Sequence, residues 1–285
     1  MLYDPTPDAL LRPQLADPLE PGQFSECLDA RCAELARLAY YSFAPDQLPR
    51  LEQALAGLGL SAPDLIEDRH RDTQAFVTLD PQRTAYVVFR GTESTSRRDI
   101  ITDALFLRRP WSGRAWVHLG FRRAYDNRST RADATNVRRA LSELIATLAP
   151  RRIVATGHSL GAALATLFAT DHPTAELVTF GSPLVGNAAF AALFAGRTVH
   201  RYRQCADFVT RIPFEWMGYL HVAAASYLDR HGERNDKADI AADIAAARAE
   251  YRQRYHGLPD TVPLRDGADH APINYISAVL GVRED

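Results

Sequence analysis

The sequence lacks an excess of either charge, a long apolar run and a cysteine framework. Its 33 basic and 35 acidic residues nearly cancel, which removes the electrostatic attraction that nucleic-acid binding needs. We therefore expect no nucleic-acid partner. No window approaches the roughly 18 consecutive apolar residues of a membrane-spanning helix. The three cysteines, Cys27, Cys32 and Cys205, are too few and too irregularly placed for a disulfide framework, so we expect reduced thiols.

The amino terminus has no basic start followed by an apolar stretch, which is the pattern of a secretory signal. This absence predicts a cytoplasmic location and leaves a secreted mature form open. Residues 1–22 are rich in proline and acid and lack periodicity, which predicts an arm on the surface. The chain has 285 residues, of which 46% are apolar. We therefore expect residues 23–285 to form one α/β domain.

Strand patterns alternate with helical patterns through most of the chain. Residues 75–79 and 85–89 are apolar runs separated by a turn-forming cluster, which predicts a hairpin. Further strands are expected at 152–156, 177–180 and 199–205, and helices at 24–43, 122–148, 162–170, 188–194, 238–255 and 271–280. This alternation predicts a mainly parallel sheet covered by helices on both faces.

Residues 157–161 read Gly-His-Ser-Leu-Gly and fit the Gly-x-Ser-x-Gly nucleophile elbow. In this sharp strand-to-helix turn, the serine hydroxyl is lifted above the edge of the sheet. The two glycines let the strand and the helix approach without a Cβ collision. Because an apolar strand pattern precedes the motif and an alanine-rich helix pattern follows it, Ser159 is the candidate nucleophile.

A serine hydroxyl is a weak nucleophile until a base takes its proton, so a histidine oriented by a carboxylate must follow. On a fold with this elbow, the chain order is serine, acid, histidine. Asp207 is the leading acid because it follows a strand at its carboxyl end, and Asp229 and Glu215 are the alternatives. His270 is favoured as the base because it lies in a loop before the last helix, and His221, within an apolar run, is its rival.

The tetrahedral intermediate of ester hydrolysis needs hydrogen-bond donors for its oxyanion. The Leu160 backbone amide supplies one by its position directly after the nucleophile. A second donor is expected at the end of an early strand, where Gly91 lets the chain turn. The amide and the hydroxyl of Thr92 are the candidates there.

Several motifs, taken in order along the chain, resemble the class 3, or fungal-type, triacylglycerol lipase family. These are Val-Val-Phe-Arg-Gly-Thr at 87–92, Val-His-Leu-Gly-Phe at 117–121, the elbow, and Thr-Phe-Gly-Ser-Pro-Leu-Val-Gly-Asn at 179–187, with Asp207 and His270 completing the set. The resemblance covers about residues 75–275. It implies an α/β-hydrolase fold, a triad of Ser159, Asp207 and His270, and an oxyanion hole formed by Thr92 and Leu160.

The resemblance also implies that residues 93–109 are similar to the family's lid. The apolar residues of this segment would cover an apolar cleft when closed and meet lipid when open. They are Ile100, Ile101, Leu105 and Phe106. A helix packed permanently on the core is the alternative. The lid interpretation predicts contact with a lipid–water interface.

We therefore predict a carboxylic ester hydrolase, a serine esterase or lipase, that cleaves triacylglycerols or shorter acyl esters through an acyl-enzyme. A phospholipase A1, a feruloyl-type esterase and a non-enzymatic binding module on a hydrolase scaffold are the alternatives. The predicted chemistry needs neither a metal nor an organic cofactor. A membrane-surface scaffold would need a basic face, and five arginines near the lid-like segment, at 97, 98, 108, 109 and 114, are its only support. The sequence leaves the oligomeric state open.

Overall fold

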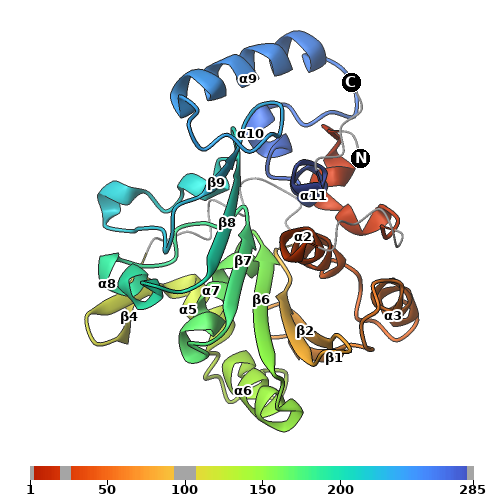
Figure 1. Ribbon diagram of the computed structural model, residues 1–285, viewed down its shortest axis with the longest axis vertical. Helices are drawn as coiled ribbons and strands as arrows, with labels where there is room; N and C mark the ends of the chain where they lie inside the picture. The colour runs from red at the N-terminus through yellow and green to blue at the C-terminus, as the bar shows by residue number, and fades with distance from the viewer. Residues whose placement is uncertain (1–2, 20–26, 93–106, 281–285) are drawn as a thin grey trace.

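The computed structural model describes residues 3–19, 27–92 and 107–280 (Figure 1). Within them, a seven-stranded sheet has the order β1-β2-β3-β6-β7-β8-β9. Its strands are β1 (Asp64–Asp68), β2 (Thr73–Leu79), β3 (Thr84–Phe89), β6 (Arg152–His158), β7 (Glu176–Phe180), β8 (Val199–Gln204) and β9 (Ser226–Leu228). The strands from β3 to β9 pair in parallel, while β1, β2 and β3 pair antiparallel. The α/β class and the mainly parallel sheet expected from the sequence are confirmed.

Helices cover both faces of this sheet because alternate strand residues point to opposite sides. In β3, Val87 and Phe89 belong to one core, while Tyr86 and Val88 belong to the other. The first core is covered by α5 (Leu119–Tyr125), α6 (Val137–Leu148), α7 (Leu160–Asp171) and α8 (Ala188–Ala191). The second is covered by α2 (Leu28–Leu38), α3 (Leu48–Gly57) and α11 (Pro272–Leu280).

The remaining elements lie around the edges of the main sheet. Near the carboxyl end of β8, at the top of Figure 1, are α9 (Ile240–Tyr255) and α10 (Arg265–Ala268). The short elements are α1 (Pro7–Leu11), β4 (Arg108–Ser112), β5 (Ala115–His118), and the 3-10 helices η1 (Pro13–Leu15), η2 (Ala192–Phe194), η3 (Val209–Arg211) and η4 (Glu215–Met217). No helix in the described ranges has both the length and the apolar character needed to cross a membrane.

The helix expected over 122–148 was wrong, and several elements were missed. The helix expected over 122–148 is two helices, because α5 ends at Tyr125 and Asn136 begins α6 by accepting a hydrogen bond from the Arg139 amide. The intervening segment is rich in Asp, Asn and Ser, whose side chains favour caps and turns over helix interiors. Strand β1 was missed because acids flank its short apolar core. The stretch around His221 forms only an isolated bridge at Leu220.

The amino-terminal residues pack against the last elements of the chain. Ala9 of α1 is buried together with Ala271 and Ile273. The Asp4 amide donates to the side chain of Asn274 at 2.7 Å. The division of the chain at residue 22 into an arm and one domain stays a prediction.

Candidate active site

Ser159 lies in a tight turn between β6 and α7. Its backbone has φ 57° and ψ −125°, a conformation that costs energy for a residue with a side chain. A Cβ on Gly157 would lie 2.5 Å from the Gly161 carbonyl carbon, and one on Gly161 would collide with the Phe89 carbonyl. Gly157 therefore lets strand β6 and helix α7 pass close together, and Gly161 lets α7 pass close to the end of β3.

The structure brings Ser159, His270 and Asp207 together, although they are far apart in the sequence. Ser159 Oγ lies 2.9 Å from His270 Nε2. His270 Nδ1 lies 3.0 Å from Asp207 Oδ2. The three side chains are buried, with residue exposures of 6%, 2% and 0% in the order serine, histidine, aspartate. This hydrogen-bonded chain has the geometry of a nucleophile, a base and an orienting acid.

The alternative acids and base lie in other surroundings. Asp229 accepts hydrogen bonds from the amides of His231 and Glu233 at 2.9 and 3.0 Å, so it caps a turn. Glu215 is exposed at the start of η4. His221 Nε2 donates to the Thr210 carbonyl at 2.8 Å. The geometry therefore supports Asp207 and His270 over these alternatives.

Two further donors reach the buried Asp207 carboxylate. The Tyr275 hydroxyl donates to Oδ2 at 2.5 Å, and the Val209 amide donates to Oδ1 at 2.9 Å. Burial and the negative charge of Asp207 raise the pKa of Tyr275 well above its ordinary value, so the phenol remains a neutral donor. A buried carboxylate needs such donors because it has lost its water. Sequence reasoning missed Tyr275, which was placed only as a member of the last helix.

His158 holds the backbone of His270 through a hydrogen bond. Its Nε2 donates to the His270 carbonyl at 2.8 Å, and its Nδ1 accepts from the Tyr40 hydroxyl at 2.8 Å. Burial, and then the charge of His270, hold the pKa of His158 well below its ordinary value. A neutral imidazole with its proton on Nε2 satisfies both contacts. His158 is the variable residue next to the nucleophile in the elbow, and the motif alone gives it no role.

Gly181 has no side chain, and this leaves room for the side chains of Asp207 and His270. Its φ is +59°, and a Cβ there would lie 3.0 Å from Asp207 Oδ2 and 3.1 Å from His270 Nδ1. The left-handed conformation and the contact both exclude a larger residue. The sequence marks this glycine only as part of the Gly-Ser-Pro stretch after β7.

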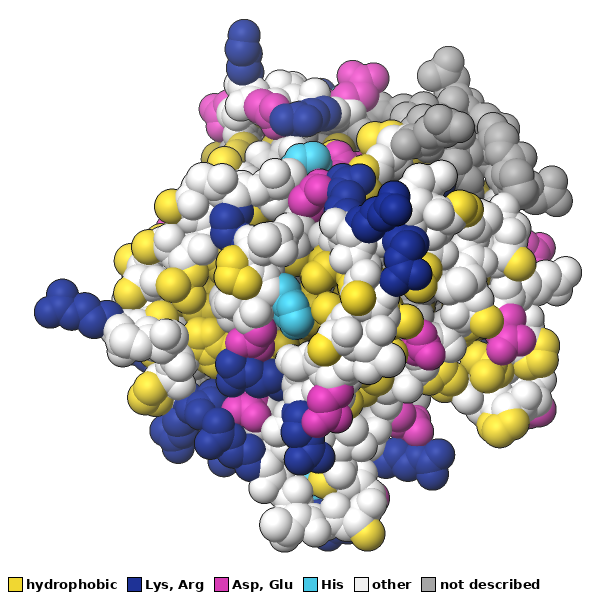
Figure 2. Space-filling model, turned by 60° about the horizontal axis from the view of Figure 1, so that its bottom comes forward, with side chains coloured by type: hydrophobic (Ala, Val, Ile, Leu, Met, Phe, Trp, Pro, Cys, Tyr) yellow, Lys and Arg dark blue, Asp and Glu magenta, His cyan; other side chains and the backbone are white. Residues whose placement is uncertain are grey.

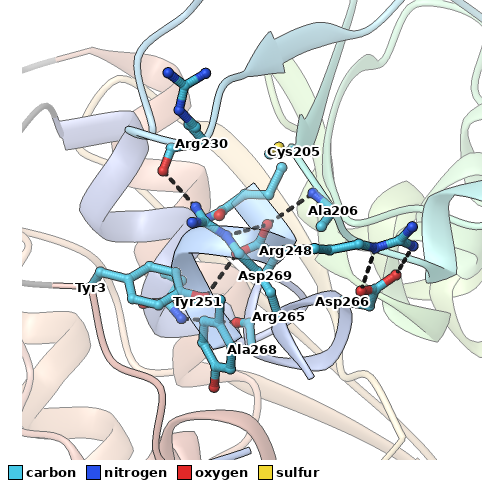
Figure 3. A network of polar contacts seen from close by, with 12 residues as sticks. Tyr3, Cys205, Ala206, Arg230, Arg248, Tyr251, Arg265, Asp266, Ala268 and Asp269 are labelled. Carbon is cyan, nitrogen blue, oxygen red and sulfur yellow. Dashed lines mark hydrogen bonds and ion pairs between the residues drawn. The ribbon is translucent and has the colours of Figure 1, made fainter. Parts of the chain in front are cut away.

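A buried carboxylate, Asp269, joins the loops that carry the acid and the base (Figure 3). It accepts from the Ala206 amide and the Tyr3 hydroxyl, each at 2.8 Å, and from Arg265 Nε at 3.1 Å. Burial raises the pKa of Asp269, while the positive charge of Arg265 opposes that shift. Ala206 directly precedes Asp207, and Asp269 directly precedes His270. These bonds therefore fix the two loops relative to each other.

The candidate oxyanion donors lie at the same edge of the sheet. Leu160 is the first residue of α7, and Thr92 is exposed just beyond β3. A Cβ on Gly91 would collide with the Tyr40 hydroxyl and lie 2.9 Å from the His158 carbonyl, so the chain before Thr92 passes close to the elbow. The lid-like residues Ile100, Ile101, Leu105 and Phe106 lie outside the described residues.

No cluster of three or more His, Cys, Asp or Glu side chains in the described ranges is arranged to hold a metal ion. The three cysteines are free thiols. Burial raises the pKa of Cys205 to about 12 and that of Cys32 further still. Both therefore remain protonated, and neither has the character of a thiolate ligand or nucleophile.

Comparison with known proteins finds a family that is similar to this chain around the site. Residues 86–217, which include the elbow and Asp207, match the family model described as lipase (class 3). This part of the chain is similar to the class 3 lipase family. Secreted mono- and diacylglycerol lipase A of Penicillium cyclopium is 33% identical over 169 residues, covering 56% of this chain and 53% of its own length. Phospholipase A1-II 5 of Oryza sativa subsp. indica is 30% identical over 181 residues, 52% of this chain and 39% of its own.

Solved structures of fungal lipases have the same fold. Lipase II from Rhizopus niveus has a TM-score of 0.57 and 25% identity, over 70% of this chain and 78% of its own. A mutant form of MDLA from Penicillium cyclopium has a TM-score of 0.53 and 29% identity, over 69% and 77%. The α/β-hydrolase fold expected from the resemblance is confirmed. The chain spans about half the length of the curated Penicillium relative that it matches.

The cytoplasmic location expected from the sequence is contradicted. The relatives from Penicillium cyclopium, Penicillium camembertii and Fusarium solani are all named secreted lipases. The expectation rested on a missing signal pattern. The absence of that pattern is no evidence about location in a chain that spans only part of the length of its relatives.

Proposed function

We propose that the protein is a carboxylic ester hydrolase whose nucleophile is Ser159. The observation that carries the proposal is the continuous contact from Ser159 Oγ through the His270 ring to Asp207, at 2.9 and 3.0 Å. The match of residues 86–217 to the class 3 lipase family model supports the same reaction class. A scaffold kept only for binding would have no need to bury this histidine and carboxylate beneath a serine in a strained turn.

In the proposed reaction, Ser159 Oγ attacks the ester carbonyl carbon while His270 Nε2 takes the hydroxyl proton. Asp207 stabilises the imidazolium that forms. The amides of Leu160 and Thr92 are the proposed donors to the oxyanion. His270 then gives its proton to the leaving alcohol, and the acyl group stays on Ser159. Water attacks this acyl-enzyme with His270 again as base, which releases the carboxylic acid and restores the serine.

The proposed substrates are acylglycerols or shorter acyl esters. The Penicillium and Fusarium relatives support this choice, since they are named mono- and diacylglycerol lipases. The rice relatives named phospholipase A1 favour the sn-1 ester of a phospholipid as the second candidate. Both candidates use the same acyl-enzyme chemistry and differ in the alcohol that leaves.

Labelling with a fluorophosphonate probe and hydrolysis of p-nitrophenyl esters of graded chain length test the proposal together. We expect the unmodified chain to be labelled and to hydrolyse the esters, and Ser159→Ala to do neither. Ser142→Ala is the matched control, because the Ser142 hydroxyl only donates to the Arg138 carbonyl within α6, and it should behave like the unmodified chain. Hydrolysis that persists in Ser159→Ala would refute the assigned nucleophile.

A further inference from the structure

Five arginines surround a cavity of about 330 Å³ that none of the triad residues lines. The lining residues come from the β1–β2 turn, from β4, from α5 and from the loop after α5. They are His70, Arg71, Arg109, Leu119, Arg122, Arg123, Asp126, Asn127, Arg128 and Ser129. We call this set the arginine pocket. Figure 2 shows that basic side chains gather in groups on one face of the molecule, with hydrophobic side chains between them.

The arginine pocket is short of negative charge. Asp126 is its one acid, and this carboxylate already pairs with Arg128 at 2.9 Å. Among the described residues, no carboxylate lies within ion-pair distance of the four other arginines, at 71, 109, 122 and 123. Arg122 Nη1 donates to the Pro110 carbonyl at 2.8 Å, which positions this guanidinium without neutralising it. Several uncompensated guanidinium groups around one hollow attract an anion.

Arginine favours phosphate among the possible anions. Its planar fork donates two parallel hydrogen bonds to a pair of phosphate oxygens. A cavity of about 330 Å³ is at the small end of ligand sites and has room for a phosphate and the atoms next to it. The net charge of the whole chain is −2, so this basic character belongs to the pocket and not to the protein as a whole.

The arginine pocket lies at the edge of the sheet that carries Ser159. Strand β1 pairs antiparallel with β2, which pairs antiparallel with β3. The end of β1 therefore lies at the same edge as the ends of β3 and of its parallel neighbour β6, which leads into Ser159. His70 and Arg71 form the turn after β1. If the arginine pocket contacts a surface, the sheet edge that carries Ser159 therefore also lies towards that surface.

We propose that the arginine pocket binds the phosphate groups of an anionic lipid surface and so holds the Ser159 edge of the sheet against that surface. The choice of a lipid surface over a soluble phosphate rests on the proposed function, whose substrates lie in such a surface. Leu107, two residues before the pocket residue Arg109 along the chain, is 46% exposed. This apolar side chain is placed to enter the lipid beside the bound phosphates.

Vesicle co-sedimentation tests the proposal with Ser159→Ala as the parent protein, so that the lipid stays intact and the result does not depend on catalysis. The vesicles are phosphatidylcholine alone and phosphatidylcholine mixed with phosphatidylglycerol. We expect the parent to bind the anionic vesicles and not the neutral ones, with binding that falls as salt rises. Arg71→Gln with Arg123→Gln should weaken that binding roughly 30-fold, about 5-fold for each charge.

Arg83→Gln with Arg151→Gln is the matched control. It removes the same charge from the opposite edge of the sheet, where these residues precede β3 and β6, and it should bind like the parent. Equal loss in the two double variants, or equal binding to neutral vesicles, would overturn the proposal. Saturable binding of inorganic phosphate that needs Arg71 and Arg123, without vesicle binding, would assign the pocket to a soluble phosphate and overturn the lipid surface. With Ser159 intact, both double variants should hydrolyse a soluble ester at the unmodified rate, which confirms their folding.

Discussion

Replacing Asp269 by alanine tests whether one buried carboxylate holds the two loops of the candidate active site together. Asp269 is 0% exposed and its partner Arg265 is 9% exposed. In Asp269→Ala, the guanidinium stays buried without its counter-charge, which costs about 3–5 kcal/mol. The Ala206 amide and the Tyr3 hydroxyl lose their acceptor in the same change. Since these contacts share one acceptor, their costs are not additive.

This loss is large compared with the stability of a folded domain, about 5–15 kcal/mol. For a chain of 285 residues, the entropy of unfolding near the melting temperature is about 0.6 kcal/mol per kelvin. A loss of about 3–5 kcal/mol therefore corresponds to a fall in melting temperature of about 5–8 °C. Urea denaturation at fixed pH gives the free energy directly. Calorimetry gives the shift in melting temperature.

Two variants separate the loop-joining role from a general effect of charge. Asp266 lies on the short helix α10, which Asp269 caps, and pairs with Arg248 and Arg211, whose side chains are 45% and 36% exposed. Asp266→Ala should therefore cost less than about 2 kcal/mol, up to about 1 kcal/mol for each pair near the surface. Adding Arg265→Met to Asp269→Ala removes the stranded charge and should recover part of the loss. Equal losses in Asp266→Ala and Asp269→Ala, or no recovery in the double variant, would refute the reasoning.

Three further changes have distinct expected outcomes. Gly181→Ala should reduce fluorophosphonate labelling by about 100-fold, because its Cβ displaces the His270–Asp207 pair; labelling at the unmodified rate would refute the contact. Tyr275→Phe should lower the free energy of unfolding by about 1.5–3 kcal/mol, because it removes a donor to a buried charge; unchanged urea unfolding would show that the bond contributes nothing. His221→Gln should reduce acid sensitivity. Burial lowers the pKa of His221 to about 3, so below about pH 6.5 only the unfolded state takes up the proton and stability falls by up to about 1.4 kcal/mol per pH unit. Urea unfolding between about pH 7 and pH 4 checks this, and an identical pH slope in His221→Gln would contradict it.

The fold and the candidate triad could be predicted because their signals are local. The elbow is five consecutive residues in a strand-turn-helix context, and the Asp207 and His270 candidates follow from chain order and from their place after a strand or before a helix. Alternation of strand and helix patterns gave the sheet without any knowledge of its contacts. Each inference needed only a window of sequence.

The residues behind the triad could not be predicted in this way. Tyr40 and His158 are 118 residues apart, and Tyr275 and Asp207 are 68 apart. A single tyrosine in a helical pattern looks like an ordinary core residue, and nothing near it in the sequence marks its hydroxyl as a donor. The helical pattern over residues 24–43 places Tyr40 near the end of that helix. It does not indicate that the Tyr40 hydroxyl contacts His158. Such pairs can be identified only in the folded structure, where the sheet brings distant loops to one edge.

The same distant pairs explain why the elbow sequence is necessary for this site and does not build it alone. The turn fixes Ser159, but His270 is held by other elements: its carbonyl accepts from His158, and its ring nitrogen faces Asp207. Asp207 in turn keeps its place through Tyr275. A chain with the same five-residue motif and apolar residues at these supporting positions would present the serine without a fixed base. The motif therefore predicts the nucleophile, and the buried polar contacts behind it decide whether that nucleophile has a partner.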